Sequence, residues 1–299
     1  MTKLKDYISL LRVPQWAKNA FVALPLFFDG SMTDTHRLWL MLVAVICFSL
    51  AASAVYCLND LVDVAADRLH PVKCQRPLAS GRVSRAEGLV LMLLCIALAV
   101  AACLWLLPMS AFYILLVYVA LNVAYSLVLK QVGILDMLIV AFFYVLRILF
   151  GGVAVSIHPT SWLLLMAFLL ALFLVIAKRR DDVLVMEQGG SSVRKSAQAY
   201  NLEFINLALT LVATITIVCY IMYTMSAETI SHFHTEYVYA TSVFVIAGIL
   251  RYMQVTIVAG KSGSPTKVLF KDRFVQLCLI GWILAFVLII YLPQWCQAA

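Results

Sequence analysis

Three aspartates and an asparagine are grouped in one short stretch of the sequence, Asn59-Asp60-Leu61-Val62-Asp63-Val64-Ala65-Ala66-Asp67. Positions i, i+3 and i+7 lie near one face of a helix, so this spacing predicts a stripe of three carboxylates. Carboxylates that repel one another at the end of an apolar segment need a cation beside them. Because the donors are hard oxygens without His or Cys nearby, we expect Mg²⁺ rather than Zn²⁺ on Asn59, Asp60, Asp63 and Asp67. The alternative is a solvated helix end in salt bridges with Arg68, Lys73 and Arg76.

Basic residues follow these aspartates directly, at Lys73, Arg76, Arg82 and Arg85. Pro71 and Pro77 prevent a continuous helix there, which predicts a loop or a short broken helix over the aspartates. Guanidinium and ammonium groups bind phosphate oxygens, so we expect Lys73 and Arg76 to form the basic part of a phosphate site, with Lys18 reaching the same side. The alternative for each of them is a positive charge placed at the lipid headgroups.

A second group of polar side chains lies where two apolar stretches meet. Tyr125, Ser126 and Lys130 end one stretch, and Asp136 opens the next. Arg147 follows Asp136 by three helical turns and therefore lies on the same helix face. An Arg at this depth in an apolar segment indicates a functional site, with a buried ion pair or a snorkelling side chain as the alternative.

The third group is a charged run at the end of a later apolar stretch, Lys178-Arg179-Arg180-Asp181-Asp182. The helix macrodipole favours positive charge at a C-terminus, so part of this run is expected in any such helix. Lys178 and Asp182 are one turn apart and could both point into a bundle. The sequence leaves open whether Asp181 or Asp182 joins the site.

The segments between these groups are strongly apolar. Of the 299 residues, 64% are hydrophobic and only 12% are charged, and the mean hydropathy is +0.99, which excludes an ordinary soluble globular protein. Stretches of about twenty apolar residues match the hydrocarbon core of a bilayer. We therefore predict an all-α polytopic membrane protein. Its nine expected spans, or eight if the proline-interrupted first one does not cross, are 19–34, 38–58, 87–107, 109–128, 134–156, 160–177, 204–224, 237–258 and 274–292.

The distribution of charge predicts the orientation of these spans. With a cytoplasmic N-terminus, 20 of the 22 Lys and Arg residues fall on the cytoplasmic side, leaving Arg37 outside and Arg147 within a span. The C-terminus then lies outside. The long cytoplasmic segments 59–86 and 178–203 carry seven of the 15 acidic residues and are expected to hold the site. Nucleic acid is not an expected partner, because the sequence has no basic stripe interleaved with aromatic residues on a soluble face.

The first aspartate group and the residues after it resemble a known family signature. Asn59-Asp60-x-x-Asp63-x-x-x-Asp67-Arg68, followed by Arg76-Pro77-Leu78-x-Ser80-Gly81-Arg82, is similar to the first motif of the UbiA superfamily of intramembrane prenyltransferases. The resemblance implies one nine-helix transmembrane domain over residues 1–299. In that family, two aspartate-rich cytoplasmic loops hold Mg²⁺ and a diphosphate, and a lipid tail lies in a lateral chamber.

The second motif departs from the pattern of most members, which carry several aspartates where this sequence has Lys178-Arg179-Arg180-Asp181-Asp182. This departure argues against an ordinary prenyl-diphosphate donor site. Three other segments resemble the decaprenyl-phosphate phosphoribosyltransferase branch instead, so the resemblance spans nearly the whole chain. They are Gln15-Trp16-x-Lys18-Asn19, Tyr125-Ser126-x-x-x-Lys130 through Leu135-Asp136 to Leu146-Arg147, and Ser264-Pro265-Thr266-Lys267-Val268-Leu269-Phe270-Lys271-Asp272-Arg273.

That branch implies transfer of phosphoribose from phosphoribosyl pyrophosphate to a polyprenyl phosphate of the decaprenyl type. The reaction would release pyrophosphate at the cytoplasmic face of a bacterial inner membrane and supply precursors for cell-envelope glycolipids. The resemblance also implies a homo-oligomer, with a trimer expected.

On this interpretation, the three aspartates and Asn59 hold Mg²⁺ against the pyrophosphate. The phosphate groups are expected to contact Lys18, Lys73, Arg76, Lys130, Lys178 and Arg179, with Arg147 and Tyr125 as deeper orienting groups and Asp136 and Asp182 in the same substrate-binding set.

Two alternatives remain at this stage. One is a prenyltransferase that attaches a polyprenyl chain to an aromatic acceptor, as in quinone or haem pathways. The other is a transporter or a membrane scaffold, which paired broken helices and an inverted hydropathy repeat would favour.

Overall fold

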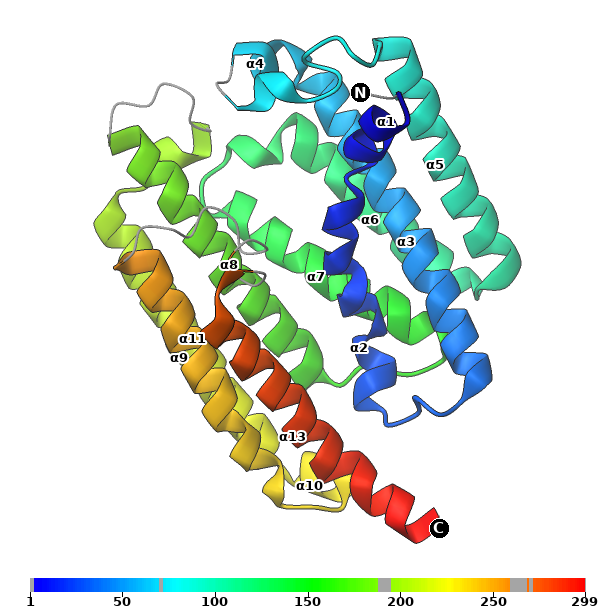
Figure 1. The fold of residues 1–299 in the computed structure, drawn as a ribbon, viewed down its shortest axis with the longest axis vertical. Coiled ribbons are helices and arrows are strands. Elements are labelled where there is room, and N and C mark those ends of the chain that lie inside the picture. The colour runs from blue at the N-terminus through cyan, green and yellow to red at the C-terminus, as the bar shows by residue number, and fades with distance from the viewer. Residues whose placement is uncertain (1–2, 70–71, 188–194, 259–267, 269–270, 299) are drawn as a thin grey trace. The chain divides into compact units, whose positions relative to one another are not determined.

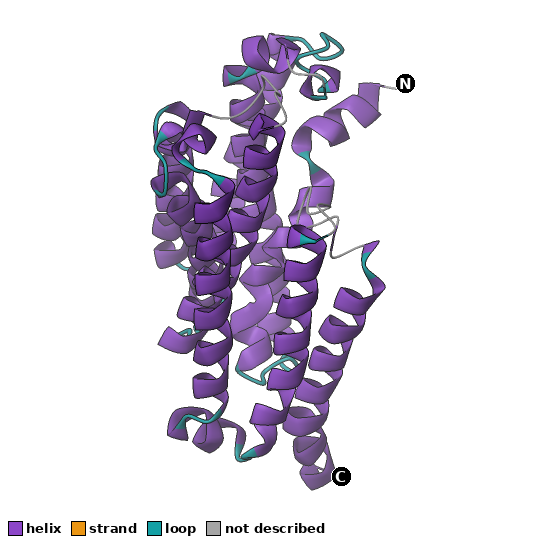
Figure 2. Ribbon diagram, turned by 90° about the vertical axis from the view of Figure 1, so that its left-hand side faces the viewer, coloured by secondary structure: helices purple, strands orange, loops and turns teal. Residues whose placement is uncertain are grey.

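The computed structural model describes residues 3–69, 72–187, 195–258, 268 and 271–298, and over these residues it is helical without strands (Figures 1 and 2). The predicted all-α class is therefore confirmed. Pro71, residues 188–194 of the second predicted site segment and most of the 264–273 motif lie outside the described residues.

Seven of the described helical segments are long and apolar enough to cross a membrane, and each coincides with a predicted span. The segment α8 continues beyond its predicted end, so the charged run at 178–182 is helical. The nine-span count and the orientation stay predictions. The segments are α3 (Thr35–Val62), α5 (Arg85–Leu106), α6 (Met109–Leu127), α7 (Leu135–Ala154), α8 (Ser161–Glu187), α9 (Leu202–Thr224), and η5 (Tyr237–Thr241) with α11 (Ser242–Ile257); α13 (Arg273–Ala298) covers the predicted last span.

The predicted first span, 19–34, is not a single helix. After α1 (Lys3–Leu11), Arg12 adopts a left-handed conformation with φ of 52°. A 3₁₀ helix, η1 (Val13–Asn19), then leads into the short α2 (Ala20–Phe28). Pro14 occupies the first turn of η1, where a backbone N–H would have no partner within the helix, so its missing N–H costs no hydrogen bond. Gly30, with φ of 79°, follows the end of α2. Both η1 and α2 pack along α3 (Figure 1).

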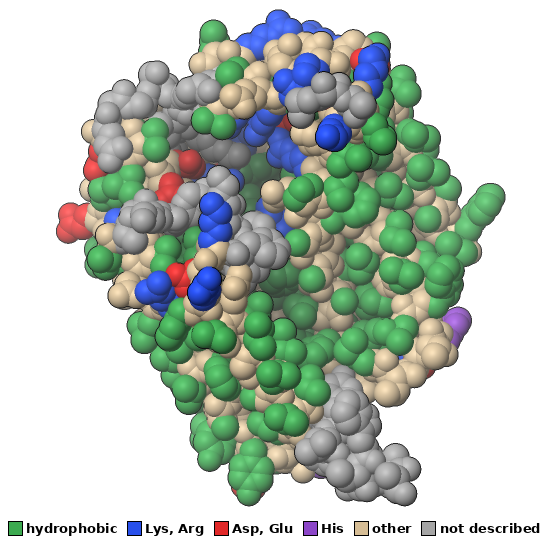
Figure 3. Space-filling model, in the orientation of Figure 1, with side chains coloured by type: hydrophobic (Ala, Val, Ile, Leu, Met, Phe, Trp, Pro, Cys, Tyr) green, Lys and Arg blue, Asp and Glu red, His purple; other side chains and the backbone are tan. Residues whose placement is uncertain are grey.

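The contacts divide the chain into two compact units. The first comprises residues 1–130 and 143–159, and the second comprises 131–142 and 160–299, so α7 contributes to both. In the first unit, α3 packs against α5, α6 and α2; in the second, α8 packs against α9, and α11 packs against α13. The end of the first unit that carries α1 and α4 (Val64–Leu69) gathers Lys and Arg side chains, whereas hydrophobic side chains cover its flanks (Figure 3).

Two side-chain caps fix where the long helices of the first unit begin. Asp34 precedes α3, and its Oδ1 accepts hydrogen bonds from the backbone N–H groups of His36 and Arg37. Ser84 and Glu87 form a reciprocal capping box at the start of α5. The capping box of α5 also ends the segment between α3 and α5, which carries Asp63, Asp67 and the basic residues after them.

Candidate functional site

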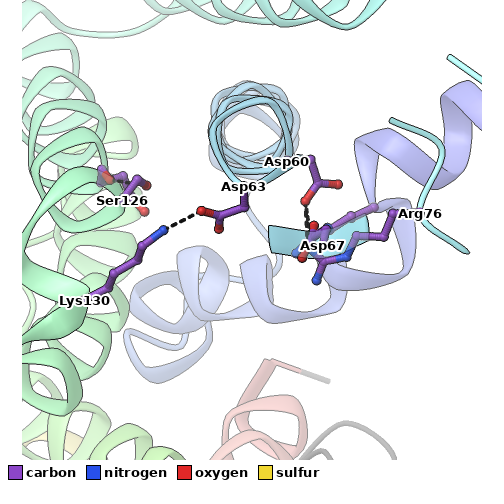
Figure 4. Close-up of polar contacts among 8 residues, drawn as sticks. Asp60, Asp63, Asp67, Arg76, Ser126 and Lys130 are labelled. Atoms are coloured by element: carbon purple, nitrogen blue, oxygen red, sulfur yellow. Dashed lines mark hydrogen bonds and ion pairs between the residues drawn. The ribbon is translucent and has the colours of Figure 1, made fainter. Parts of the chain in front are cut away.

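The three aspartates do not form one stripe on one helix, because α3 ends at Val62 and α4 starts at Val64. Asp63 is the residue between the two helices, with φ of −89° and ψ of 4°. The change of direction separates the carboxylates. Asp60 and Asp67 point to one side, and Asp63 points to the other (Figure 4). The predicted single stripe is thereby corrected to a pair and a separate carboxylate.

Arg76 joins the pair. Its Nη1 donates to Asp60 Oδ1 at 3.0 Å and to Asp67 Oδ2 at 2.7 Å (Figure 4). Both aspartates are buried, at 2% and 4% exposure, and Arg12 Nη2 also donates to Asp60 Oδ1 while its guanidinium stacks on the Tyr56 ring at 4.8 Å. Buried carboxylates need such compensation, and two guanidinium groups provide it here.

Asp63 pairs with a different basic residue. Lys130 Nζ donates to Asp63 Oδ1 at 2.8 Å from η3 (Leu129–Gln131), the short helix after α6 (Figure 4). Ser126 is buried, and its hydroxyl donates to the Asn122 carbonyl, whereas the buried Tyr125 ring packs edge-on against Phe143. The predicted group of Tyr125, Ser126 and Lys130 therefore reaches the aspartate motif through Lys130.

The loop after the aspartates has the predicted broken form. Lys73–Gln75 make one 3₁₀ turn, η2, and Arg76 is extended, as expected for a residue before proline. Arg82 Nε donates to the buried Asp6 of α1 at 2.8 Å, and Arg68 Nε donates to the Ala79 carbonyl. Arg82 and Arg68 thus hold the loop in place, and Arg76 contacts the aspartates.

The donor chemistry of the pair suits a divalent cation. Oxygens of Asp60 and Asp67 converge on one cationic atom, Arg76 Nη1, and carboxylate oxygens are the ligands that Mg²⁺ prefers. Asn59 lies one residue before Asp60 on the last turn of α3. Within the described ranges, however, no three Asp, Glu, His or Cys side chains lie close enough to hold a metal. A metal here would need oxygen ligands from a substrate as well.

Arg147 lies deeper in the first unit. It is 5% exposed, and its Nε and Nη1 donate to Asn19 Oδ1 and to the Phe143 carbonyl, each at 2.9 Å. It makes no ion pair with Asp136. Lys18, the neighbour of Asn19 on η1, is half-buried, and its pKa falls to about 8 because of this burial and of the positive charges of Arg147 and Arg12.

Asp136 organises a separate cluster in the second unit. Its side chain is fully buried, accepts from Arg179 Nε at 2.7 Å and accepts from the Ser196 and Tyr200 hydroxyls at 3.2 Å each. Arg179 Nη1 also donates to Asp182 Oδ2 at 2.8 Å. The predicted residues Asp136, Arg179 and Asp182 are therefore brought together, with their charges directed at one another.

Arg180 has a structural role that the sequence did not indicate. It is buried and donates to Asn206 Oδ1 at 2.8 Å and to the Thr256 carbonyl at 2.6 Å, at the C-terminal end of α11. Helix C-termini attract positive charge, which explains this contact. Lys178, by contrast, is exposed. The charged run thus divides into an exposed Lys, an ion-paired Arg and an Arg that caps α11.

Sequence reasoning also missed Arg12, Ser196 and Tyr200. Arg12 was counted only as a topological charge, and its left-handed backbone has no sequence signal, since Arg is not a residue that favours positive φ. Ser196 lies in η4 (Lys195–Ala199) and Tyr200 directly follows it, and they are 60 and 64 residues from Asp136. Contacts across such separations cannot be read from the spacing of one sequence.

Comparison with known proteins places this geometry in a family. The model of the UbiA prenyltransferase family matches residues 20–188. A decaprenyl-phosphate phosphoribosyltransferase of Mycolicibacterium smegmatis is 34% identical over 289 residues, which cover 92% of this chain and 89% of that protein. The enzyme of the same name from Corynebacterium glutamicum is 30% identical over 289 residues, covering 95% and 86%.

The fold agrees with these relatives. The solved structure of a UbiA homolog from Archaeoglobus fulgidus, bound to DMAPP and Mg²⁺, matches with a TM-score of 0.69 at 20% identity, covering 96% of this chain and 99% of that chain. The helical fold, the matching family model and the similarity along nearly the full length agree with the motif at Asp60, Asp63 and Asp67. This chain belongs to the UbiA prenyltransferase family.

Proposed function

We propose that this protein transfers phosphoribose from phosphoribosyl pyrophosphate to a polyprenyl phosphate of the decaprenyl type, with release of pyrophosphate. Two relatives of that name, similar over nine tenths of the chain, support the proposal. The structural observation that carries it is a surplus of positive charge. Each aspartate of the motif already has a basic partner, while Lys18 and Arg147 have no carboxylate within ion-pair distance among the described residues. This balance suits substrates that bring several phosphate groups.

The reaction needs little proton transfer. An acceptor phosphate oxygen attacks C1 of the ribose, the bond from C1 to the pyrophosphate oxygen breaks, and pyrophosphate leaves with the bonding electrons. A phosphate monoester has a second pKa of about 6, so the nucleophile is already anionic at neutral pH. The main task of the protein is to orient both substrates and to stabilise charge on the leaving group.

In this proposal Asp60, Asp63 and Asp67, with Asn59, would hold Mg²⁺ together with pyrophosphate oxygens, which supply the ligands that the separated carboxylates lack. The metal would neutralise the pyrophosphate as it leaves. Lys73, Arg76 and Lys130 bind phosphate oxygens directly, and Tyr125 orients the substrate from the end of α6. In the second unit, we assign the exposed Lys178 to phosphate binding, whereas Arg179, Asp136 and Asp182 hold one another in position.

The setting proposed for the reaction is the cytoplasmic face of a bacterial inner membrane, where it would supply cell-envelope glycolipid precursors from a homo-oligomeric enzyme. The test is to incubate purified protein with labelled phosphoribosyl pyrophosphate and a polyprenyl phosphate, in Mg²⁺ or in EDTA. Label that enters the organic phase only with Mg²⁺, and not with Asp63→Ala, supports the proposal. A folded protein that labels no polyprenyl phosphate, but attaches a polyprenyl chain to an aromatic acceptor, would contradict it.

A further inference from the structure

Arg147 is a buried cation whose partners are all neutral. At 5% exposure it contacts the Asn19 amide oxygen, a backbone carbonyl and three aromatic rings, those of Phe48, Tyr118 and Tyr144, whose centroids lie 5.0–5.5 Å from its guanidinium carbon. No carboxylate among the described residues lies within ion-pair distance of it. A charge inside a membrane helix without a counter-ion is costly, so an anion at this position would be stabilised strongly.

A second cation lies beside it. Lys18 directly precedes Asn19, the residue whose Oδ1 accepts from Arg147, and burial together with the charges of Arg147 and Arg12 lowers the pKa of Lys18. Lys18 also has no carboxylate partner among the described residues. Two cations without a carboxylate partner among the described residues, one of them buried, therefore lie on either side of the Asn19 contact.

Hydrogen bonds and close backbone packing hold Asn19 and Arg147 in a fixed geometry. Asn19 is 1% exposed, and it donates through Nδ2 to Ser49 Oγ at 2.8 Å while its Oδ1 accepts from Arg147. One turn beyond Arg147, a Cβ on Gly151 would lie 1.8 Å from the Val22 carbonyl oxygen, so the backbones of α7 and α2 touch. The close contact and the Asn19 hydrogen bonds fix the Arg147 side chain before any ligand arrives.

The surroundings distinguish between the two phosphate-bearing substrates. Asn19, which holds Arg147, binds α3 at Ser49, three helical turns before Asp60 on the same helix, so Arg147 is held farther along α3 than the aspartate pair. Aromatic rings and apolar helices surround Arg147 there. This setting suits the head of a lipid whose chain remains in the bilayer, rather than a water-soluble donor.

From these contacts we infer that Lys18 and Arg147 bind the phosphate group of the lipid acceptor, a phosphate monoester at the end of a polyprenyl chain. The inference rests on the proposed function, because that function supplies the lipid phosphate. Lys18 and Arg147 neutralise the phosphate, and the Asn19 side chain holds Arg147 toward it.

Binding without turnover tests this assignment. Detergent-solubilised protein in EDTA, without phosphoribosyl pyrophosphate, is mixed at pH 7 with a labelled polyprenyl phosphate or with the uncharged polyprenol of the same length. We expect Lys18→Gln to weaken binding of the phosphate at least about tenfold and Arg147→Gln to weaken it further, with polyprenol binding unchanged, because charge-assisted hydrogen bonds are lost. Lys3→Gln, an exposed Lys that binds Glu87, is the matched control and should change neither value.

Several results would overturn the assignment. One is an equal affinity of wild type and Lys18→Gln for the polyprenyl phosphate. If Arg147→Gln does not fold, Lys18→Gln tests the assignment by itself. Competition by phosphatidylglycerol as effective as that by the polyprenyl phosphate would indicate a general anionic-lipid site instead. Inorganic phosphate that competes with the polyprenyl phosphate at equal concentration would assign the cations to a soluble ligand. So would a Lys18→Gln protein that binds phosphoribosyl pyrophosphate more weakly but binds the polyprenyl phosphate normally. Charge-dependent lipid binding by a protein that transfers no phosphoribose would support this site while refuting the proposed reaction.

Discussion

Arg76 Nη1 lies 2.7 Å from Asp67 Oδ2, so a basic residue of the loop after α4 occupies the position of a cation between buried carboxylates. The same nitrogen contacts Asp60, whose side chain is 3% exposed. The two carboxylates are thus compensated by a side chain that also suits phosphate binding. A divalent cation at this position would take over the compensation and release Arg76 toward a phosphate group.

Removing Arg76 should therefore make stability depend on metal. We expect Arg76→Gln to lower the unfolding temperature in EDTA, by an amount equivalent to roughly 3–5 kcal/mol, because buried charges lose their partner. Added Mn²⁺ or Mg²⁺ should restore part of that loss in Arg76→Gln and have a smaller effect on wild type. Intrinsic tryptophan fluorescence on heating measures both. An Arg76→Gln protein as stable in EDTA as the wild type would argue that the contacts with Asp60 and Asp67 matter little.

Asp63 gives the cleanest test of catalysis among the three aspartates. Its side chain is 37% exposed, and a partly exposed pair such as Asp63 and Lys130 contributes at most about 1 kcal/mol to stability. Asp63→Ala should then keep the wild-type unfolding temperature, within a few degrees, and lose at least about 100-fold in transfer activity through weaker stabilisation of the leaving group. Asp60→Ala is the comparison, and we expect it to lose both properties. Retention of activity by a folded Asp63→Ala would remove Asp63 from the proposed site.

The sequence predicted the apolar spans and the broken loop better than the site. Each of the seven long apolar helices among the described residues coincides with a predicted span, and Pro77 correctly excluded a continuous helix, because both signals are local. The predicted carboxylate stripe was wrong in one physical respect. Periodicity predicts the face on which a residue lies only as far as the helix continues. The residue type at Asp63 does not indicate that α3 ends just before it.

Long-range partners were the other gap. Arg147 and Asn19 are 128 residues apart, and Arg12 and Asp60 are 48 residues apart. The type of Arg147 and its depth in an apolar segment correctly marked it as unusual. Its partner could not be predicted, because Asp136, the acidic residue on the same predicted helix face, is instead paired with Arg179.

The lowered pKa of Lys18 predicts a pH limit. Burial and the charges of Arg147 and Arg12 lower it from 10.5 to about 8, so Lys18 is charged below that pH and increasingly neutral above it. We expect kcat/KM for the polyprenyl phosphate to fall as pH rises through about 8, because this ratio reports groups of the free enzyme. Lys18→Arg should move the fall to higher pH, since a guanidinium stays charged. Identical profiles for the two proteins would show that another group sets the limit.

Asp136 is expected to act on stability rather than to touch substrate. Asp136→Asn removes the fully buried carboxylate that pairs with Arg179, and we expect a loss of roughly 3–5 kcal/mol for breaking a buried pair. Hydrogen exchange over Ser196–Tyr200 should accelerate, because Asp136 accepts from both terminal side chains of that segment. Asp182→Asn, at a 31% exposed side chain on the same Arg, is the control and should have a smaller effect. Unchanged exchange in Asp136→Asn would contradict this role.

Gly151 tests the contact between α7 and α2. A Cβ there would lie 1.8 Å from the Val22 carbonyl oxygen, so Gly151→Ala must push the two backbones apart. We expect a loss of about 1–3 kcal/mol, typical of overpacking, together with weaker binding of polyprenyl phosphate as Arg147 shifts from Asn19. Gly248→Ala is the matched control, because its Cβ would meet Cys278 Cβ at an ordinary 3.6 Å. Similar unfolding temperatures for both variants would argue against the close contact.

Because η1 is a 3₁₀ helix, the spacing of its hydrogen-bonding side chains matches the spacing of two serines on the α-helix α3. Trp16 Nε1 donates to Ser53 Oγ, and Asn19 donates to Ser49 Oγ, so residues three apart on η1 meet serines four apart on α3. Three residues of a 3₁₀ helix and four of an α-helix both advance about 6 Å, whereas three residues of an α-helix advance only about 4.5 Å. The four-residue spacing of these serines on α3 therefore favours the tighter winding of η1.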